Sequence, residues 1–195
     1  MFELPISVTI EDKEYPIRNK GDYRMVLDCF NAMNDEQLSQ QDQLVTALII
    51  FYDNVIDEYD LLDMFGTDLE TPIREMFRFF NCGKDNPPGT QLPYKLVDWE
   101  QDSQLIAAAV NNVANREIRT DSYTHWWTFM GYYLSIGESA FSTVVGIRGK
   151  IKKGKKLEKY EQEYKRDNPQ YFVWDSTTKA DREAMELVNE IWNKQ

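Results

Sequence analysis

The sequence has little of what zinc sites and disulfide frameworks are built from. Its 195 residues include one histidine, His125, and two cysteines, Cys29 and Cys82. Zinc sites use closely spaced sets of ligands, often Cys-x-x-Cys pairs, which three isolated side chains do not provide. Two scattered cysteines in a chain of this size are typical of reduced, buried thiols. We therefore expect neither a zinc site nor a disulfide.

Positive charge and long apolar runs are also scarce. The chain has 22 Lys and Arg against 33 Asp and Glu, which gives a net charge of −11. Proteins that bind DNA or RNA generally present positive charge to the phosphates, so this balance argues against a nucleic-acid partner. No apolar run reaches the roughly 18 residues that a membrane-spanning helix needs. We expect an intracellular protein that does not associate with a membrane.

Motifs that would carry catalysis or a cofactor are missing too. There is no glycine-rich phosphate loop, no Gly-x-Ser-x-Gly and no paired-histidine metal motif. One cluster of carboxylates could hold a metal as in a nuclease, but an acidic helix end in an acidic protein explains it more simply. Glu100 and Asp102, beside Trp99, are either an acid/base pair or carboxylates of a first helical turn, and we favour the latter. The clustered carboxylates are Asp53, Asp57, Glu58, Asp60 and Asp63.

Positive charge is concentrated in one stretch. Residues 148–166 contain nine Lys and Arg against three Glu, whereas residues 1–147 contain ten basic and twenty-four acidic residues. This distribution predicts an acidic body with one basic segment near the C-terminus. The basic segment could pair with the acidic body of another copy, which predicts self-association in head-to-tail oligomers.

Hydrophobic residues make up 42% of the chain, which is ample for a core. Leu4, Ile6, Val8 and Ile10 alternate with polar residues, and a short return strand containing Pro16 follows, so the N-terminus is expected to form a β-hairpin. An isolated hairpin is only marginally stable and must pack on the elements that follow it. Most of the remaining chain has helical periodicity. The predicted fold is mainly α and bundle-like, with a short N-terminal β-hairpin.

Three helices are predicted in the first half of the chain, over residues 22–33, 39–56 and 71–83. Ser39 is expected to cap the second helix, with Pro72 at the first position of the third and Gly83 as its end. The predicted inward faces are Met25, Val26, Cys29, Phe30 and Met33, then Leu44, Leu48, Phe51, Tyr52 and Val55, then Ile73, Met76, Phe77 and Phe80.

A loop over residues 84–95, rich in proline and polar residues, divides the chain. Helices are predicted after it over 98–113, 122–137, 138–150, 154–170 and 177–192, of which the fourth is highly charged and the last amphipathic. Asp98 and Gln101 resemble a capping box at the start of the first of these. The predicted organisation is an N-terminal part (1–83), a second helical part (98–150) and a charged C-terminal part (151–195). Predicted inward residues are Leu105, Ile106, Ala109 and Val113, then Trp126, Phe129, Met130 and Tyr133, then Phe141, Val144, Val145 and Arg148, and in the last helix Ala184, Leu187, Val188 and Ile191.

His125 directly precedes a pair of tryptophans. A histidine that acts as a general base needs an orienting carboxylate and a nucleophile or substrate, and the surrounding segment shows neither. A helix cap or a packing residue is therefore the favoured interpretation. Trp126 and Trp127 would point about 100° apart on a helix, so one is expected to be buried and the other to lie at a boundary or interface.

Three segments occur in a suggestive order: "DWEQDSQLIAAA" (98–109), "HWWTFMGYY" (125–133) and "FSTVVGIRGK" (141–150). Together they resemble a family of small bacteriophage proteins from long-tailed phages and prophages of Gram-positive bacteria, and the resemblance covers nearly the whole chain. The family has no known catalytic residues, so none are assigned here. The matched motif positions, whose role is in the fold or at a partner interface, are Asp98, Trp99, His125, Trp126, Trp127, Phe129 and Arg148.

Genes of this family usually lie between those for the major tail protein and the tape-measure protein. The resemblance therefore implies a non-enzymatic tail-assembly chaperone that keeps the tape-measure protein soluble until tail-tube subunits replace it. It places the protein in the cytoplasm of the infected or lysogenic host. The alternatives are a structural virion subunit of the tail or connector and, less favoured, a metal-dependent enzyme that uses the carboxylates between residues 53 and 63.

Overall fold

The structure is a computed structural model that describes residues 3–85 and 96–173. These residues form eight α-helices and an N-terminal antiparallel hairpin, which confirms the predicted fold class. The predicted helix over 177–192 lies outside the described residues. The described elements are β1 (Ser7–Ile10), β2 (Lys13–Pro16), α1 (Tyr23–Met33), α2 (Gln40–Phe51), α3 (Glu58–Phe65), α4 (Glu70–Phe80), α5 (Ser103–Ala114), α6 (Trp126–Leu134), α7 (Ala140–Lys152) and α8 (Lys159–Asp167), with short 3₁₀ turns at Arg18–Gly21, Ile118–Thr120 and Pro169–Tyr171.

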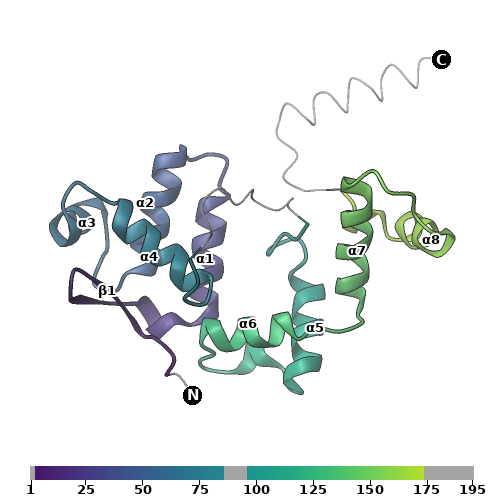
Figure 1. Cartoon of the computed structure of the whole chain (residues 1–195), viewed down its shortest axis with the longest axis horizontal. Helices are drawn as coiled ribbons and strands as arrows, with labels where there is room; N and C mark the ends of the chain where they lie inside the picture. Colours follow the sequence, from purple (N-terminus) through teal and green to yellow (C-terminus); the bar gives the residue numbers. More distant parts are fainter. Residues whose placement is uncertain (1–2, 86–95, 174–195) are drawn as a thin grey trace, which may run out of the picture.

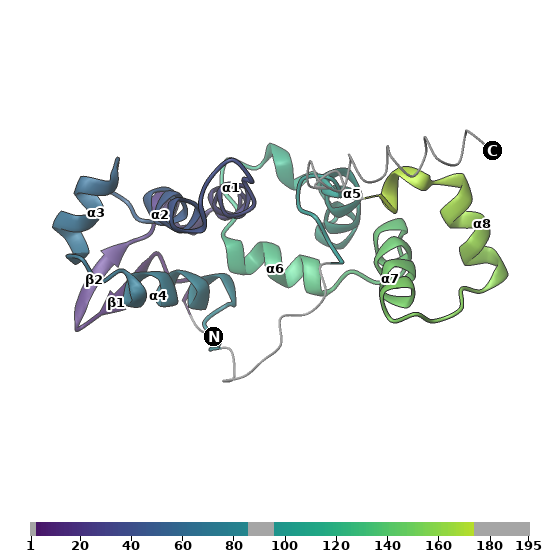
Figure 2. The ribbon, with the colours of Figure 1, turned by 90° about the horizontal axis from the view of Figure 1, so that it is seen from above.

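The helices follow one another along an elongated molecule (Figures 1 and 2). The hairpin and α3 lie at one end, α8 lies at the other, and α5 and α6 lie between them. α1 packs against α2 and α6, α2 against α3 and α4, and α5 against α6 and α7. In the part of the chain that the structure describes, no helix is both long enough and apolar enough to cross a membrane.

The hairpin packs on α4 through β1. Val8 pairs with Tyr15 across the two strands, and the side chains of Val8 and Ile10 are buried. Of the four alternating apolar residues, Leu4 and Ile6 are 45% and 52% exposed. Both precede β1, which begins only at Ser7.

Helix α4 differs from its prediction in register. It begins at Glu70, so Pro72 is its third residue rather than its first. Phe79 is buried on α4, whereas Phe77, which we predicted to face inward, is 37% exposed. The cause is that Met76 already faces the core, and the next residue on a helix points about 100° away from it.

Arg18 completes the C-terminal end of α2. Its guanidinium donates hydrogen bonds to the carbonyl oxygens of Ile49 (3.1 Å), Ile50 (3.1 Å) and Tyr52 (3.0 Å), and to that of Val55. The last carbonyls of a helix have no partner within the helix, and a cation near them also interacts favourably with the helix dipole. A side chain from the turn after the hairpin therefore fixes the end of α2.

One continuous core joins both halves of the chain. Residues from β1, α1, α2, α4, α5 and α6 belong to the same cluster of buried side chains. The predicted parts 1–83 and 98–150 thus contribute to a single core, in which Trp126 of α6 is 1% exposed. α8 is mostly exposed, as its charge predicted, and it is tied to α7 by a 2.7 Å ion pair between Lys150 and Glu161.

Candidate functional site

His125 is the N-cap of α6, as predicted. Its Nδ1 accepts a hydrogen bond from the backbone N–H of Trp127 (3.0 Å), and its Nε2 lies 2.9 Å from the carbonyl oxygen of Pro5. Because Nδ1 is an acceptor, Nε2 carries the proton and donates to Pro5. Burial lowers the pKa of the imidazole, against smaller raising effects of the Pro5 carbonyl and Asp22. The side chain holds α6 to the segment before β1 as a neutral group.

The two tryptophans anchor α6 to the end of α4. The indole N–H of Trp126 donates to the carbonyl oxygen of Phe80 (3.0 Å), and that of Trp127 donates to the carbonyl oxygen of Phe79 (2.9 Å). Both acceptors belong to the last turn of α4, whose carbonyls lack partners within the helix. Trp126 is fully buried and Trp127 half-buried, which confirms that one lies inside and the other at a boundary. That boundary lies within the molecule, between α4 and α6.

Arg148 and Asp102 form a buried ion pair that the sequence did not predict. The guanidinium of Arg148 donates to both oxygens of the Asp102 carboxylate, at 2.6 and 2.9 Å, and to the carbonyl oxygens of Leu96 (3.0 Å) and Tyr171 (2.8 Å). The Arg148 side chain is 6% exposed and that of Asp102 0%. Asp102, which we expected to be a carboxylate at the start of a helix, is the N-cap residue of α5, and its carboxylate is buried against Arg148. The pair joins the start of α5 to α7 and, through Arg148, to the 3₁₀ turn after α8.

Asp98 does not open α5 as a capping box would. Its carboxylate accepts hydrogen bonds from the backbone N–H groups of Glu100 (3.0 Å) and Gln101 (2.9 Å), and its own N–H donates to Asp102 (2.9 Å). α5 begins only at Ser103. Asp98 thus closes a turn that precedes the helix. This turn positions Trp99.

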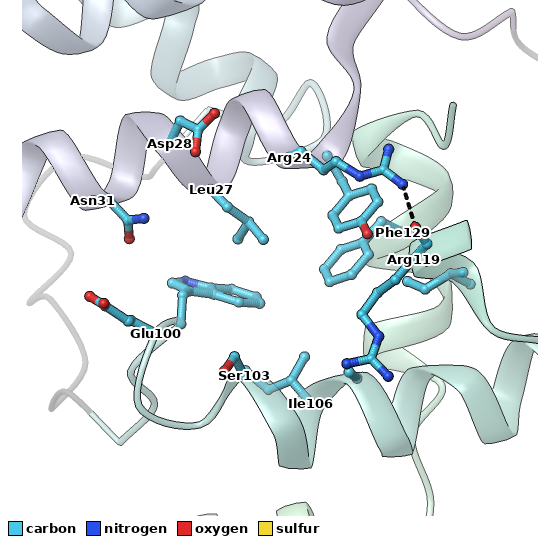
Figure 3. Close-up of a pocket in the computed structure, with 13 residues that line it drawn as sticks. Arg24, Leu27, Asp28, Asn31, Glu100, Ser103, Ile106, Arg119 and Phe129 are labelled. Carbon is cyan, nitrogen blue, oxygen red and sulfur yellow. Dashed lines mark hydrogen bonds between the residues drawn. The ribbon is translucent and has the colours of Figure 1, made fainter. Parts of the chain in front are cut away.

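Trp99 and Phe129 lie in one aromatic cluster beside a pocket between α1 and α5 (Figure 3). The ring of Phe129 stacks on that of Tyr23, with centroids 4.7 Å apart, and the ring of Trp99 stacks on that of Phe30 at 5.9 Å. Trp99 also contacts Tyr133 of α6 at 5.1 Å. The cluster holds the turn at residue 99 against α1 and α6.

The pocket, which we call the α1–α5 pocket, has a volume of about 430 Å³. Leu27 points into it from α1 and Ile106 from α5, and Trp99 also lines it. Polar side chains surround this apolar floor, so an occupant would meet apolar contacts at the centre and hydrogen-bonding groups at the rim (Figure 3). The lining residues are Tyr23, Arg24, Leu27, Asp28, Asn31, Trp99, Glu100, Ser103, Ile106, Ala107, Ile118, Arg119 and Phe129.

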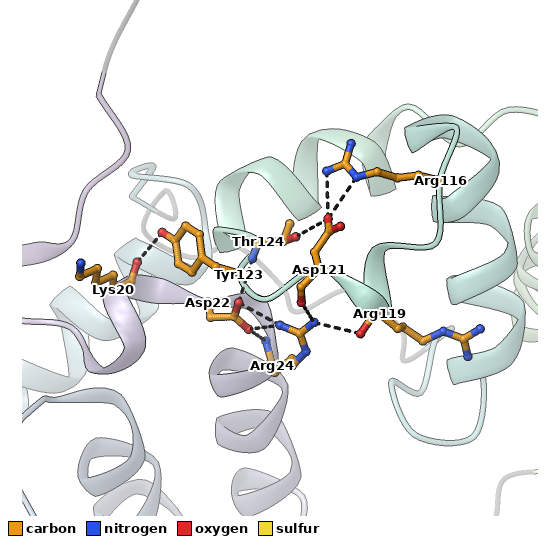
Figure 4. Close-up of polar contacts among 8 residues, drawn as sticks. All are labelled: Lys20, Asp22, Arg24, Arg116, Arg119, Asp121, Tyr123 and Thr124. Carbon is orange, nitrogen blue, oxygen red and sulfur yellow. Dashed lines mark hydrogen bonds and ion pairs between the residues drawn. The ribbon is translucent and has the colours of Figure 1, made fainter.

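A polar junction closes one end of the pocket and joins the two halves of the chain (Figure 4). The Asp22 carboxylate accepts from the N–H of Thr124 (2.9 Å) and pairs with Arg24 at 3.1 Å. Arg24 in turn donates to the carbonyl oxygens of Asp121 (2.7 Å) and Arg119 (3.3 Å). The N-terminus of α1 and the segment before α6 are therefore held together by charged hydrogen bonds, which are stronger than neutral ones.

The carboxylates between residues 53 and 63 serve α3 in ways that need no metal. Asp57 is its N-cap and accepts from the N–H of Asp60 (3.0 Å), while the Asp60 carboxylate accepts from the N–H of Ile56 (2.9 Å). Within residues 3–85 and 96–173, no group of three or more His, Cys, Asp or Glu side chains is gathered as metal ligands would be.

The motif residues are thus distributed over three structural tasks: His125 and the tryptophans fix α6, Asp98 and Arg148 fix the turn before α5, and Trp99 and Phe129 border the pocket. The sequence was also compared with models of known protein families. The family model described as "Bacteriophage Gp15 protein" matches residues 1–172.

The chain belongs to the bacteriophage Gp15 protein family. The match confirms the resemblance to a phage family over most of the chain, while the role in tail assembly and the host group stay predictions. No curated protein and no solved structure matches the chain.

Sequence reasoning missed most of the pocket of this Gp15 family member. Trp99 and Phe129 were singled out, but Arg24, Leu27 and Arg119 were not. Leu27 stands outside the apolar face predicted for the helix over 22–33, next to Val26. A large apolar side chain just off the inward face of an amphipathic helix is the one local signal that could have indicated a second, partly covered surface.

Proposed function

We propose that the protein is a non-enzymatic tail-assembly chaperone that binds the tape-measure protein and keeps it soluble. The α1–α5 pocket carries this proposal, because it offers a partner apolar surface that the described chain leaves uncovered. Membership in a bacteriophage protein family supports a role in phage biology. The location that follows is the cytoplasm of the infected or lysogenic host, and the tail-tube protein is the second expected partner, since it replaces the chaperone during assembly.

The dimensions of the pocket suit a helical segment. Its α1 wall runs from Arg24 to Asn31, eight residues whose seven steps correspond to about 10 Å of helix. An occupant of two turns would place apolar side chains at i, i+3 or i+4, and i+7, as amphipathic helices do when they bind in grooves. Leu27, Trp99 and Ile106 would contact that face.

The charged rim could orient such a helix. Arg24 and Arg119 lie at one end of the pocket and Glu100 at the other, as Figure 3 shows. Arg119 is ion-paired with Glu117 at 2.7 Å, and its hydrogen bonds hold the pKa of that carboxyl at about 2, so both partners remain ionised at physiological pH. A partner helix with charges at both ends would therefore bind in one direction in preference to the other.

The net charge of −11 suits a basic client and disfavours nucleic acid. A long helical protein that is free of its final partners exposes apolar surface, and this surface drives aggregation unless another protein covers it. A chaperone needs an apolar surface on a molecule that is soluble overall, and an acidic body that carries the α1–α5 pocket fits that need.

The test is co-expression with the large helical protein encoded beside this gene, followed by affinity purification and mass measurement. Ser103 is exposed at the mouth of the pocket, so Ser103→Trp would block the mouth without disturbing the core. Asn112→Trp is the matched control, because Asn112 is exposed on the same helix and does not line the pocket. We expect wild type and Asn112→Trp to solubilise the client and Ser103→Trp to fail.

If the client stays insoluble with the wild-type protein, and the two do not co-purify, the chaperone proposal is wrong. A structural virion subunit would instead be found at stoichiometric amounts in purified particles, from which a chaperone is absent. An enzyme that uses a divalent metal would show a thermal midpoint that rises with metal concentration, because a ligand that binds only the folded state stabilises it by mass action.

A further inference from the structure

The α3 end of the molecule exposes a row of apolar side chains. Ile56 is 85% exposed, Tyr59 81% and Leu62 39%. Tyr59 and Leu62 are three residues apart on α3, so they are neighbours on one face, and Ile56 immediately precedes that helix. Leu61 on the same helix is fully buried, so α3 uses its other face for the core. Large apolar residues gathered on one face mark a binding surface more often than single ones do.

The segment that carries this apolar row is acidic. Residues 53–70 contain seven Asp and Glu and no Lys or Arg. Several of these carboxylates cap α3 through backbone hydrogen bonds, but Glu58 and Asp63 are exposed beside Tyr59 and Leu62. A partner for this surface must therefore combine apolar contacts with positive charge.

The opposite end of the molecule has those two properties. Ile151 of α7 is 42% exposed and Tyr160 of α8 63% exposed. The segment that contains them, 148–166, has nine basic and three acidic residues. One of the acids, Glu161, is paired with Lys150, and Arg148 is buried against Asp102, so the exposed remainder, including Lys156 and Lys159, is predominantly positive.

We propose that the α3 end of one copy of this chain binds the α7–α8 end of a second copy. The two surfaces lie at opposite ends of the elongated molecule in both views, so they cannot meet within one chain (Figures 1 and 2). Each end combines exposed apolar side chains with charge, and the charge has opposite signs at the two ends. This arrangement goes beyond the proposed client binding, since it uses neither the α1–α5 pocket nor any residue that lines it.

An interface between unlike ends is heterologous, and each copy that binds leaves one end of each kind available. The assembly therefore grows as a row of copies or closes into a ring, rather than stopping at a dimer. Its attraction acts between exposed charges, which salt screens: the Debye length falls from about 8 Å near physiological ionic strength to about 3 Å at 1 M. Assembly should therefore weaken as salt is added.

The test is sedimentation velocity of the full chain at increasing protein concentration, at about 0.15 M and about 1 M salt. Two variants, which we call end-reversed, each reverse the sign of two exposed side chains at one end: Glu58→Lys with Asp63→Lys, and Lys156→Glu with Lys159→Glu. The control, Glu36→Lys with Glu138→Lys, changes net charge as the first variant does but on exposed residues of the connections before α2 and α7. Thermal midpoints verify that all variants fold.

We expect the wild type and the control to assemble. Each end-reversed variant alone should assemble at least about tenfold more weakly. Mixing the two end-reversed variants should restore assembly. The lysines introduced at the α3 end of one variant then face the glutamates introduced at the α7–α8 end of the other. Ile56→Ser with Tyr59→Ser should weaken assembly without a change in charge. Restoration by mixing is the outcome that a general charge effect could not produce.

The proposal is overturned if the end-reversed variants assemble like the wild type, or if mixing them restores nothing. It is equally overturned if the wild type stays monomeric at all concentrations. Neither result depends on client solubility, so failure of head-to-tail assembly and failure of the chaperone proposal are measured separately.

Discussion

The guanidinium of Arg148 and the carboxylate of Asp102 meet in the interior through two hydrogen bonds, although 46 positions separate them in the chain. Two more hydrogen bonds, to the carbonyl oxygens of Leu96 and Tyr171, use two further donors of the guanidinium. The pair therefore has the bidentate geometry and the additional partners that a buried ion pair needs in order to offset the cost of removing two charges from water.

Removing one member of this pair should be far more destabilising than replacing both. We expect Arg148→Met or Asp102→Leu alone to lower the free energy of unfolding by about 3–5 kcal/mol, because each leaves a buried, uncompensated charge. The double variant should recover much of that loss. Urea unfolding followed by circular dichroism measures all three. Losses that simply add in the double variant would show that the two side chains act independently.

His125 should make stability depend on pH. Its pKa in the folded protein lies below the ordinary value because burial disfavours the charged form. The unfolded chain therefore binds the proton more readily, and stability is fully present above about pH 6.5, the ordinary histidine pKa, and is lost as the pH falls below it. Urea unfolding across this range measures the loss.

His125→Asn is the control for that experiment. Asparagine can cap a helix but does not titrate, and the chain has no other histidine. We expect the variant to be less stable near neutral pH, since it loses the bond to Pro5, and its stability to change less between pH values on either side of about 6.5. If stability depends on pH in the variant as steeply as in the wild type, the carboxylates and not His125 cause that dependence.

Gly21 and Gly131 should respond to alanine in opposite ways. Gly21 has a φ of +75°, and a Cβ there would lie 2.7 Å from Cζ of Phe79 and 3.1 Å from Nε2 of His125. Gly21→Ala should cost about 2 kcal/mol or more, from the left-handed backbone and from the crowding. Gly131 is exposed within α6 and a Cβ there meets nothing within 4 Å, so Gly131→Ala should stabilise by about 0.5–1 kcal/mol. Thermal or urea unfolding of both variants measures the two changes in stability. Equal changes would contradict the crowding described at Gly21.

Trp126→Phe and Trp127→Phe remove one hydrogen bond each from the junction between α6 and α4. For half-buried Trp127 we expect a loss of about 1 kcal/mol. Trp126 is fully buried, so its removal also leaves the Phe80 carbonyl without this donor and creates a cavity, and the loss should be several-fold larger. Equal losses from the two variants in urea unfolding would argue that the indole N–H groups, and not burial, set the energy.

Local features of the fold followed from the sequence because their causes lie within a few residues. Ser39 caps α2 by accepting from the N–H of Asp42, and His125 caps α6, both as predicted. Along α4 the pattern could not decide between Phe77 and Phe79, because four of its last five residues are apolar and two adjacent faces fit equally well.

The candidate site depends on contacts that no local pattern encodes. Arg148 reaches Asp102 and Arg24 reaches Asp121 over 46 and 97 positions, so composition and periodicity show only that these residues are charged. The α1–α5 pocket exists because the turn at Trp99 stands beside α1. The ion pair that fixes this turn could not be predicted from the sequence either. The motif residues were found, yet their tasks could be assigned only from the structure.

The bond between His125 and the carbonyl of Pro5 spans 120 positions, whereas all the partners of Arg18 lie within 37. During synthesis the N-terminal residues leave the ribosome first, and the end of α2 can be completed while the second half is still being translated. The segment before β1 must then wait for α6 to emerge. Pro5 therefore leaves the ribosome before the hairpin but reaches its contact with His125 only after α6 has been made.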